Sequence, residues 1–334
     1  MGAIKPTKRF VIEPLLNCNL DCIMCYHKHK KPKWRDYTKT IDAIKKEIDA
    51  GVERGNNYMD ITGGEPSMYD HIAETITYAK SKGVKTCIIT NGCIPIEKTN
   101  ELLEAGVHGF LVSRHGLETS HNFVTNNQTA YRRQIEFLNA IAGRVHIRFN
   151  CVITRMNQSE LLHIAHEISI YKPAIVNFIN FNPHHEWKSH GILAKEFIPD
   201  LCKAQKSLDE AIEYLKLGGA GVNVRYYPMC RISQQNYECI CNDTHVTCDP
   251  YEWDYSITPK TIEQHNRWNM NCSNANELKT SPCADCGLHA QCGGINANFY
   301  TIAGQDCVQK TDENHGTDVY RYRKHAKIQL TECE

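Results

Sequence analysis

Three cysteines near the start of the chain lie close enough in sequence to bind one metal centre. Cys18, Cys22 and Cys25 form a CxxxCxxC arrangement in a tight loop. Three thiolates on such a loop can bind three irons of a [4Fe–4S] cluster and leave the fourth iron open. A redox cluster with an open iron can bind a cofactor and pass an electron directly to it. A structural zinc site has four closed ligands, and neither His27 nor His29 completes a recognisable zinc spacing.

A second group of cysteines lies near the other end of the chain. Cys283 and Cys286 form a CxxC pair, and Cys292 follows after five residues, just before Gly293 and Gly294. A CxxC pair binds zinc as well as iron–sulfur clusters, so a zinc-ribbon-like structural site is the competing interpretation. The sequence therefore predicts a second metal site in the tail.

The cysteine content is the most unusual feature of the composition. The chain has 334 residues and 17 cysteines, eleven of them from Cys202 onward. In a long chain with no export signal near its start, this number indicates reduced metal ligands rather than disulfides. Lys+Arg and Asp+Glu number 38 each, so no net charge attracts nucleic acid or a membrane surface. No apolar run approaches the ~20 residues of a membrane span. We therefore expect a cytoplasmic protein that binds neither nucleic acid nor a membrane.

The elements that must position these cysteines follow a repeated pattern. Between Arg9 and about Leu217, short apolar runs alternate with helical periodicities, which is typical of βα units and a parallel sheet. We predict six strands, each followed by a helix, with the strands near residues 10–12, 58–62, 86–90, 110–113, 145–153 and 175–181. Regular periodicity fades at Gly218, which predicts two domains with bounds 1–217 and 218–334. In a parallel sheet the chemistry lies after the carboxyl ends of the strands.

The cysteine loop and the segment Gly63-Gly64-Glu65-Pro66 together resemble the radical S-adenosylmethionine (SAM) superfamily. The defining motif of that family is CxxxCxxC followed by an aromatic residue, here Tyr26, and its GGEP sequence ends the second strand. Two glycines there allow the backbone to approach the amino group of SAM, where a β-carbon would clash. The resemblance covers about residues 9–217 and implies an α/β fold, a partial (β/α)6 TIM-like barrel.

The resemblance also implies an activity and a set of cofactors. In similar enzymes an electron, supplied by a donor such as flavodoxin or ferredoxin, passes from the cluster and cleaves SAM. The resulting 5′-deoxyadenosyl radical abstracts hydrogen from an unactivated C–H bond. Such clusters are oxygen-labile, so anaerobic conditions are expected. Asn91, Ser113 and Asn150 match positions that contact SAM in similar enzymes. Each also suits an ordinary polar residue at a turn or strand end.

The tail is similar to the SPASM extension, the auxiliary-cluster domain of many radical SAM enzymes. This resemblance implies one auxiliary [4Fe–4S] cluster bound by Cys283, Cys286, Cys292 and Cys307. The usual pattern has a further cysteine four residues after Cys292, destined for a second cluster, and this chain has Asn296 there. A second cluster would need a different ligand set, drawn from Cys230, Cys239, Cys241, Cys248 and Cys272.

A cysteine in the tail can also serve as a hydrogen donor. Epimerases of the superfamily quench a substrate radical from the opposite face with a cysteine S–H. Cys248 is the predicted catalytic donor, because its position in the tail is similar to that of the donor in aminoglycoside epimerases.

Two segments suggest how a substrate is bound. The basic run at residues 27–35 suits a phosphate or nucleotide, or simply a solvated loop. Residues 182–187, with two histidines, a glutamate and a tryptophan, suit binding or deprotonation of a polar substrate, or a hydrogen-bonded surface loop. The barrel begins near residue 9, which leaves no space for an N-terminal peptide-recognition domain.

We therefore expect a small polar metabolite as substrate, of the aminosugar, cyclitol or nucleoside type, and epimerisation or oxidation as the outcome. Maturation of a ribosomally made peptide by epimerisation or cross-linking is the alternative. A non-catalytic iron–sulfur or zinc protein is the alternative of another class. Such a protein has no reason to combine an open cluster motif with GGEP.

Overall fold

A computed structural model of the chain describes residues 9–25, 36–183, 187–241, 254–255 and 277–317. Two predicted site residues, Tyr26 and Cys248, lie outside the described residues, as do the basic run 27–35 and residues 184–186. Of Cys241, only the backbone is described.

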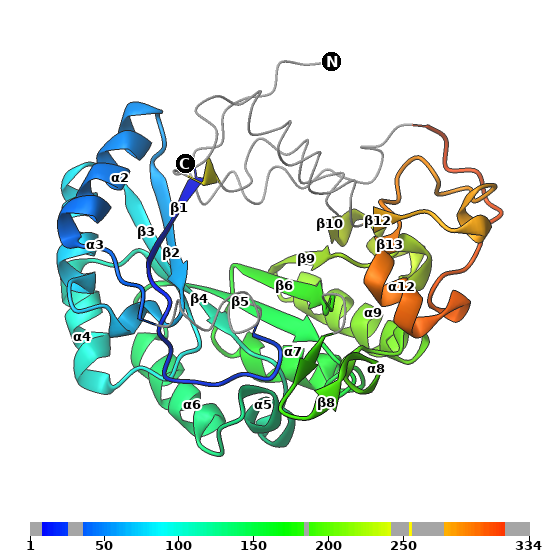
Figure 1. The fold of residues 1–334 in the computed structure, drawn as a ribbon, viewed down its shortest axis with the longest axis horizontal. Helices are drawn as coiled ribbons and strands as arrows, with labels where there is room; N and C mark the ends of the chain where they lie inside the picture. Colours follow the sequence, from blue (N-terminus) through cyan, green and yellow to red (C-terminus); the bar gives the residue numbers. More distant parts are fainter. Residues whose placement is uncertain (1–8, 26–35, 184–186, 242–253, 256–276, 318–334) are drawn as a thin grey trace.

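The fold is built on one curved, entirely parallel sheet, in the order β10-β9-β6-β5-β4-β3-β2-β1-β11. Figure 1 shows it as an open horseshoe with helices on its outer side. The six predicted strands are confirmed, as is the predicted α/β fold class. The strands are β1 Arg9–Leu15, β2 Tyr58–Gly63, β3 Lys85–Thr90, β4 Gly109–Ser113, β5 His146–Ile153, β6 Ile175–Asn180, β9 Gly221–Arg225, β10 Ile240–Cys241 and β11 Asp254–Tyr255.

The sheet continues past the six predicted strands, because β9 pairs in parallel with β6. Gly219, at φ +85°, turns the chain back immediately after the preceding helix, and Ala220 N–H donates to Leu215 O at 3.0 Å. These bonds form a helix end of the kind that glycine favours. A glycine run that resembles a domain boundary is therefore a turn into another strand. The division into residues 1–217 and 218–334 stays a prediction.

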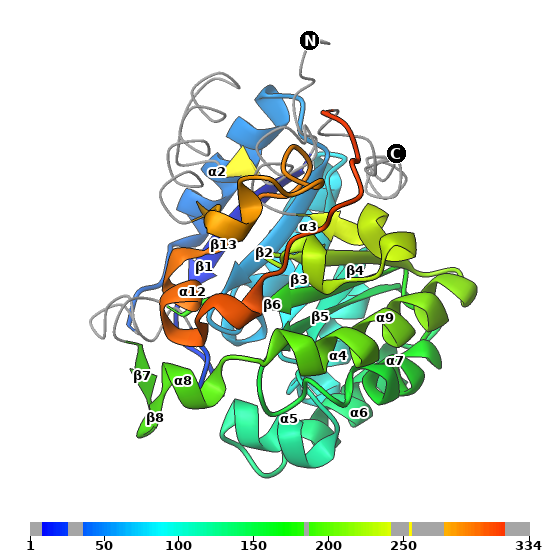
Figure 2. The ribbon, with the colours of Figure 1, turned by 90° about the vertical axis from the view of Figure 1, so that its right-hand side faces the viewer.

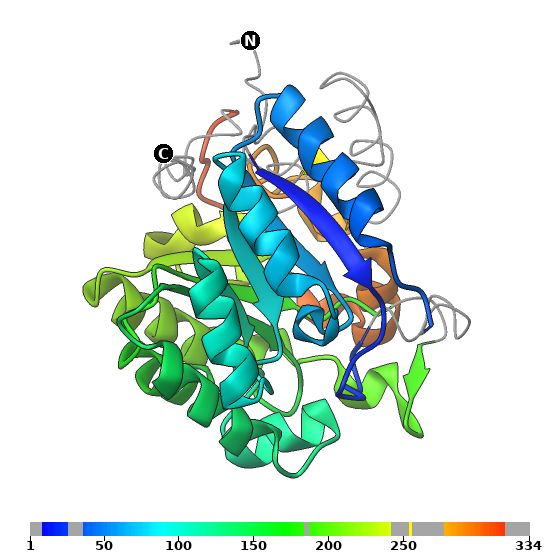
Figure 3. The same cartoon turned by 90° about the vertical axis from the view of Figure 1, so that its left-hand side faces the viewer.

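Helices cover the outer face of the sheet, as the blue helices against β1 and β2 show in Figure 3. Their inner faces are apolar: Ile44 and Ile48, for example, are fully buried on the first helix. Two helices, α5 and α8, were not predicted. The helices of the barrel are α2 Ile41–Glu53, α3 Ile72–Ser81, α4 Ile96–Ala105, α5 Glu118–Thr125, α6 Ala130–Ile141, α7 Leu161–Ser169, α8 Ala194–Phe197 and α9 Leu201–Leu217. Among the described residues, no helix is both long and apolar enough to cross a membrane.

The tail forms a small unit against the end of the barrel. Figure 2 shows α12 beside α8, and Asn298 Nδ2 donates to Pro183 O at 3.3 Å. Short 3-10 helices also occur: η2 Pro66–Met68, η3 Met229–Arg231, η4 Gln234–Cys239, η5 Ser281–Cys283 and η6 Gln305–Cys307. The remaining elements are β7 Lys188–Ser189, β8 Ile192–Leu193, β12 Glu277–Leu278, β13 Ile295–Asn296 and α12 Ala297–Ala303.

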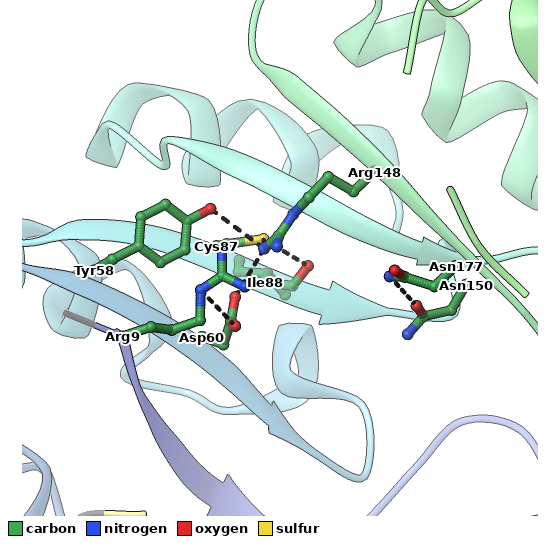
Figure 4. Close-up of polar contacts among 8 residues, drawn as sticks. All are labelled: Arg9, Tyr58, Asp60, Cys87, Ile88, Arg148, Asn150 and Asn177. Atoms are coloured by element: carbon green, nitrogen blue, oxygen red, sulfur yellow. Dashed lines mark hydrogen bonds and ion pairs between the residues drawn. The ribbon is translucent and has the colours of Figure 1, made fainter. Parts of the chain in front are cut away.

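Charged side chains fill the inner side of the sheet near the amino ends of the strands (Figure 4). Arg148 on β5 donates through Nη2 to Asp60 Oδ1 at 2.9 Å, to Cys87 Sγ at 2.9 Å and to Tyr58 OH at 3.3 Å. The Arg9 guanidinium lies 3.6 Å from Asp60 and 4.7 Å from the centre of the Tyr58 ring. Asp60 is fully buried. Arg148 therefore links β5 to β2 and β3 across the base of the barrel.

Replacement of Asp60 tests how much this charged cluster at the base of the barrel contributes to stability. Asp60→Asn keeps the shape but leaves two buried arginines without the carboxylate charge. We expect the free energy of unfolding to fall by about 3–5 kcal/mol, measured by urea denaturation. The matched control is Glu74→Gln, which removes the exposed Lys45–Glu74 ion pair at 2.6 Å and should leave stability nearly unchanged. Equal effects of the two substitutions would contradict the structural role of the base.

Candidate active site

The cysteine loop follows β1 directly and packs against two other segments of the barrel. Cys18 and Cys22 are half-buried and contact the cluster formed by Leu20, Cys93 and Ala130. The loop backbone is also fixed, because Ile23 N–H donates to Val124 O at 2.9 Å. All three loop cysteines thus lie on the carboxyl side of the sheet, where a parallel sheet carries its chemistry.

The GGEP segment holds the base of this loop through backbone hydrogen bonds. Gly64 N–H donates to Leu15 O at 3.0 Å, and Glu65 N–H donates to Asn17 O at 2.8 Å. A β-carbon on Gly63 would lie 2.2 Å from Leu15 O, and one on Gly64 would lie 1.8 Å from Asn17 O. The glycines are thus required by contact with the chain itself, in addition to the approach to SAM that the sequence predicts.

Glu65 connects the same segment to the next strand. Its carboxylate is fully buried and accepts hydrogen bonds from Thr90 Oγ1 and from Asn91 N–H, each at 2.9 Å, and from Ser67 N–H at 3.1 Å. Burial raises the pKa of Glu65, and these donors oppose that shift. The next residue, Pro66, starts η2 and is also buried. Glu65 therefore positions Asn91 at the end of β3.

Asn91 joins β3 to the cysteine loop. Its Nδ2 lies 3.7 Å from Cys18 Sγ and donates to Asn19 Oδ1 at 2.8 Å. Its Oδ1 accepts from Cys93 N–H at 2.7 Å. A side-chain donor close to a cysteine sulfur is the type of contact that tunes an iron–sulfur cluster. Of the three predicted SAM-contacting side chains at strand ends, Asn91 thus touches the cysteine loop directly.

Two residues of this region were not identified from the sequence. Gln134, fully buried on α6, donates through Nε2 to Asn91 O at 2.7 Å and to Ser113 O at 2.9 Å. It thereby joins the ends of β3 and β4. The other is Cys93, whose carbonyl accepts from Asn19 Nδ2 at 3.1 Å. The only sequence signal for Gln134 is a polar residue among the apolar positions of its helix.

A row of amide side chains continues from Ser113 across the neighbouring strands. The register places Ser113, Asn150, Asn177 and Asn223 side by side on β4, β5, β6 and β9. Asn177 Nδ2 donates to Asn150 Oδ1 at 2.8 Å, and Asn223 Nδ2 donates to Asn177 Oδ1 at 2.9 Å. All four side chains are half-buried. Figure 4 shows Asn150 and Asn177 farther along the strands than Arg148 and Asp60. We call these four residues the amide row.

The electrostatics of the loop favour neutral thiols unless positive charge is added. Burial, together with the nearby Glu65 and Cys25, raises the pKa of Cys18 to about 12. Burial and the other two loop cysteines also raise the pKa of Cys22. Bound iron would reverse this effect by stabilising the thiolates. The donor set therefore fits an iron–sulfur cluster.

The cysteine loop does not have the geometry of a site for a single metal ion. In the part of the chain that the structure describes, no three His, Cys, Asp or Glu side chains converge as ligands of one metal ion. Each cysteine of a [4Fe–4S] site binds a different iron, so its sulfurs lie farther apart than the ligands of a single ion.

A cleft of about 860 Å³ opens at the opposite end of the sheet, around the amino ends of β3, β4 and β5. Its basic lining residues are Lys80, Lys85, His108, Arg144, His146 and Lys172. Because it lies away from the cysteine loop and the amide row, it is not part of the candidate active site.

Replacement of Gly64 tests whether the glycine contact positions the cysteine loop. In Gly64→Ala the β-carbon would displace Asn17 and with it Cys18. We expect the iron content after anaerobic reconstitution to fall by about four per chain, measured by a colorimetric iron assay with circular dichroism as a check on folding. Gly218→Ala is the control, because its β-carbon would make only an ordinary contact at 3.4 Å. Full iron loading of Gly64→Ala would show that the contact is dispensable.

Comparison with known proteins agrees with this geometry. The sequence profile of the Radical SAM superfamily matches residues 12–168. A GTP 3′,8-cyclase of Clostridium perfringens is 26% identical over 208 residues, which cover 60% of this chain and 64% of that protein. The Fe-coproporphyrin III synthase of Methanosarcina barkeri is 34% identical over 108 residues, 32% of this chain and 27% of that protein. The chain thus spans less than two thirds of the length of these curated relatives.

Solved structures share the fold. SuiB of Streptococcus suis matches with a TM-score of 0.53 and 18% identity over 66% of this chain and 49% of that chain. The structure of anSMEcpe with bound AdoMet matches with a TM-score of 0.51 and 19% identity over 66% of this chain and 64% of that chain. The match of residues 12–168 to the Radical SAM superfamily agrees with the shared fold and with the position of the cysteine loop at the carboxyl face of the sheet.

Proposed function

We propose that this protein is a radical SAM enzyme that acts on a small polar substrate held in its barrel. The observation that carries the first part is the cysteine loop, which Gly64, Glu65 and Asn91 attach to the ends of β2 and β3. Cys18, Cys22 and Cys25 would bind a [4Fe–4S] cluster. When bound, the cluster and SAM supply a one-electron cleavage that yields methionine and a 5′-deoxyadenosyl radical able to abstract hydrogen from a C–H bond.

The residues around the loop would bind SAM and orient it. The Gly63–Pro66 segment presents backbone beside the loop, and Asn91 lies at the end of the next strand. Ser113 and Asn150 begin the amide row directly beside this region. Tyr26 stays a predicted contact. A flavodoxin or ferredoxin is the electron donor that we propose.

The amide row supports the substrate class. Asn177 and Asn223 extend it away from the proposed SAM contacts toward β9, and the bonded amides present neutral donors and acceptors. The next inward-facing positions in register are Val152 on β5 and Ile179 on β6, which are half-buried and apolar, and the charged Arg225 on β9. A surface of neutral amides beside aliphatic side chains suits hydroxyl, amine or amide groups on a compact carbon skeleton. An aminosugar, cyclitol or nucleoside fits this description.

Peptide maturation is the second candidate, because a peptide backbone would also pair with the amide row. Two fold neighbours were solved with peptides: SuiB with the precursor peptide SuiA, and anSMEcpe with the Cp18Cys peptide. Epimerisation or oxidation of a small metabolite remains our first choice, and Cys248 stays the predicted hydrogen donor for epimerisation. Substrate-stimulated turnover would separate these candidates from a non-catalytic iron–sulfur or zinc protein.

Cleavage of SAM is the first expected activity. The anaerobically reconstituted protein, reduced with dithionite in the presence of SAM, should release 5′-deoxyadenosine, quantified by chromatography and mass spectrometry. The triple variant Cys18/Cys22/Cys25→Ala should release none, because the open cluster needs all three thiolates. A cluster-loaded wild type that leaves SAM intact would favour the non-catalytic alternative.

The amide row gives a second test. Asn223→Ala leaves Asn177 Oδ1 without its donor, so the KM for a turnover-stimulating metabolite should rise about tenfold or more. Release of 5′-deoxyadenosine without substrate should stay unchanged. Asn100→Ala, at an exposed position on α4, is the matched control and should alter neither value. An unchanged KM in Asn223→Ala would place the substrate elsewhere.

A further inference from the structure

The cysteines of the tail converge on one small cavity, and they are not the four that the resemblance implies. Cys283, Cys286 and Cys292 line this cavity together with Cys230, which comes from η3 directly after β9. Cys307, the fourth predicted ligand, is not among its lining residues. The rest of the lining combines apolar side chains, from Pro228, Leu288 and Val308, with Lys279, His289 and Gln309 and the backbone of Gly294. We call this group of four cysteines the tail site.

Each sulfur of the tail site faces a hydrogen-bond donor. Thiolates that bind iron accept hydrogen bonds from backbone N–H and hydroxyl groups, and these contacts help to set the properties of the cluster. Three backbone groups donate to sulfur: Gln309 N–H to Cys230 Sγ at 3.4 Å, Thr311 N–H to Cys286 Sγ at 3.5 Å and Gly294 N–H to Cys292 Sγ at 3.4 Å. The fourth sulfur, Cys283 Sγ, lies 3.6 Å from Thr280 Oγ1, and either group can be the donor.

Cys307 has the opposite environment. Its Sγ lies 2.9 Å from Gly304 O, a carbonyl that can only accept a hydrogen bond. The sulfur must therefore carry its proton and donate it. A thiolate at this position would face the negative end of a carbonyl dipole. Cys307 is thus suited to remain a thiol.

Arg231 holds Cys307 away from the tail site. This buried side chain donates to the backbone carbonyls of Cys307 at 3.2 Å and Val308 at 3.4 Å and to that of Asp306. It also donates to Gln309 Oε1 at 3.0 Å. Gln309 Nε2 in turn donates to Cys230 O at 2.9 Å. A movement of Cys307 into the cavity would break this set of bonds, whereas Cys230 already lies there.

We propose that the fourth thiolate of the auxiliary cluster is Cys230, and that Cys307 remains a thiol outside the site. This assignment deepens the proposed function. On binding, each of the four thiols loses its proton and forms one sulfur–iron bond. Because four thiolates give every iron a protein ligand, the auxiliary cluster has no open iron. It would therefore carry electrons or stabilise the tail, and it would not bind the substrate directly.

The test uses the full chain with Cys18, Cys22 and Cys25 replaced by Ala, so that all bound iron belongs to the tail. After anaerobic reconstitution with iron and sulfide, this protein should contain about four irons per chain. Adding Cys230→Ala should reduce the iron to about three or fewer and change the electron paramagnetic resonance signal. Adding Cys307→Ala should leave both unchanged.

Two controls keep the result interpretable. Cys239→Ala removes another buried cysteine that does not line the cavity, and it should behave like Cys307→Ala. Cys230→Ser tests whether a loss of iron in Cys230→Ala reflects poor folding, with thermal unfolding measured for each variant. The Ser variant should fold like the parent and still show an altered spectrum.

Other outcomes would overturn the assignment. Iron loss in Cys307→Ala with full iron in Cys230→Ala would restore Cys307 as the ligand. Binding of one zinc in place of iron, or no metal at all, would reject an auxiliary cluster. The test is separate from the proposed function, because the triple variant cannot cleave SAM and its iron content does not depend on that reaction.

Discussion

The position of the cysteine loop depends on a contact between two backbone segments that leaves no space for a side chain. A β-carbon on Gly64 would lie 1.8 Å from Asn17 O, so only glycine permits the two hydrogen bonds made here. That contact fixes the residue before Cys18. The Glu65 carboxylate accepts a hydrogen bond from Asn91 N–H at the end of β3. The Asn91 side chain in turn contacts Cys18 Sγ in the loop. The ends of three strands and the loop are thus joined by one continuous set of hydrogen bonds.

The interior of the barrel changes in character along the strands. At the amino ends, Arg148 and Asp60 pair and close the base (Figure 4). The inward-facing Ile89 and Leu111 lie in register with Arg148, and the amide row follows two residues farther along the strands. The paired charges therefore lie at the base of the barrel, while the side chains of the amide row, near the cysteine loop, are neutral. On our proposal, recognition at the level of the amide row depends on hydrogen bonds and shape.

The sequence predicts those features of the fold and the site that depend on local sequence patterns. The six strands and the loop motif follow from periodicity and spacing. By contrast, β9 follows a glycine run that gives no local sign of a strand, and only its pairing with β6 reveals it. The amide row joins residues 27 and 46 positions apart in the chain, so strand register alone reveals it. The role of Gln134 could not be predicted for the same reason, because its partners lie at the ends of β3 and β4, far from α6 in the sequence.

The two cysteine groups differ in the way that their proposed roles require. The loop offers three thiolates beside the proposed SAM contacts, so one iron would stay open. The tail site offers four cysteines around one cavity; three of the sulfurs accept a hydrogen bond from a backbone N–H, and the fourth lies beside the Thr280 hydroxyl. With four protein ligands the tail cluster would have no open iron, so it would serve electron transfer or the stability of the tail. The loop cluster alone would keep an open iron for SAM.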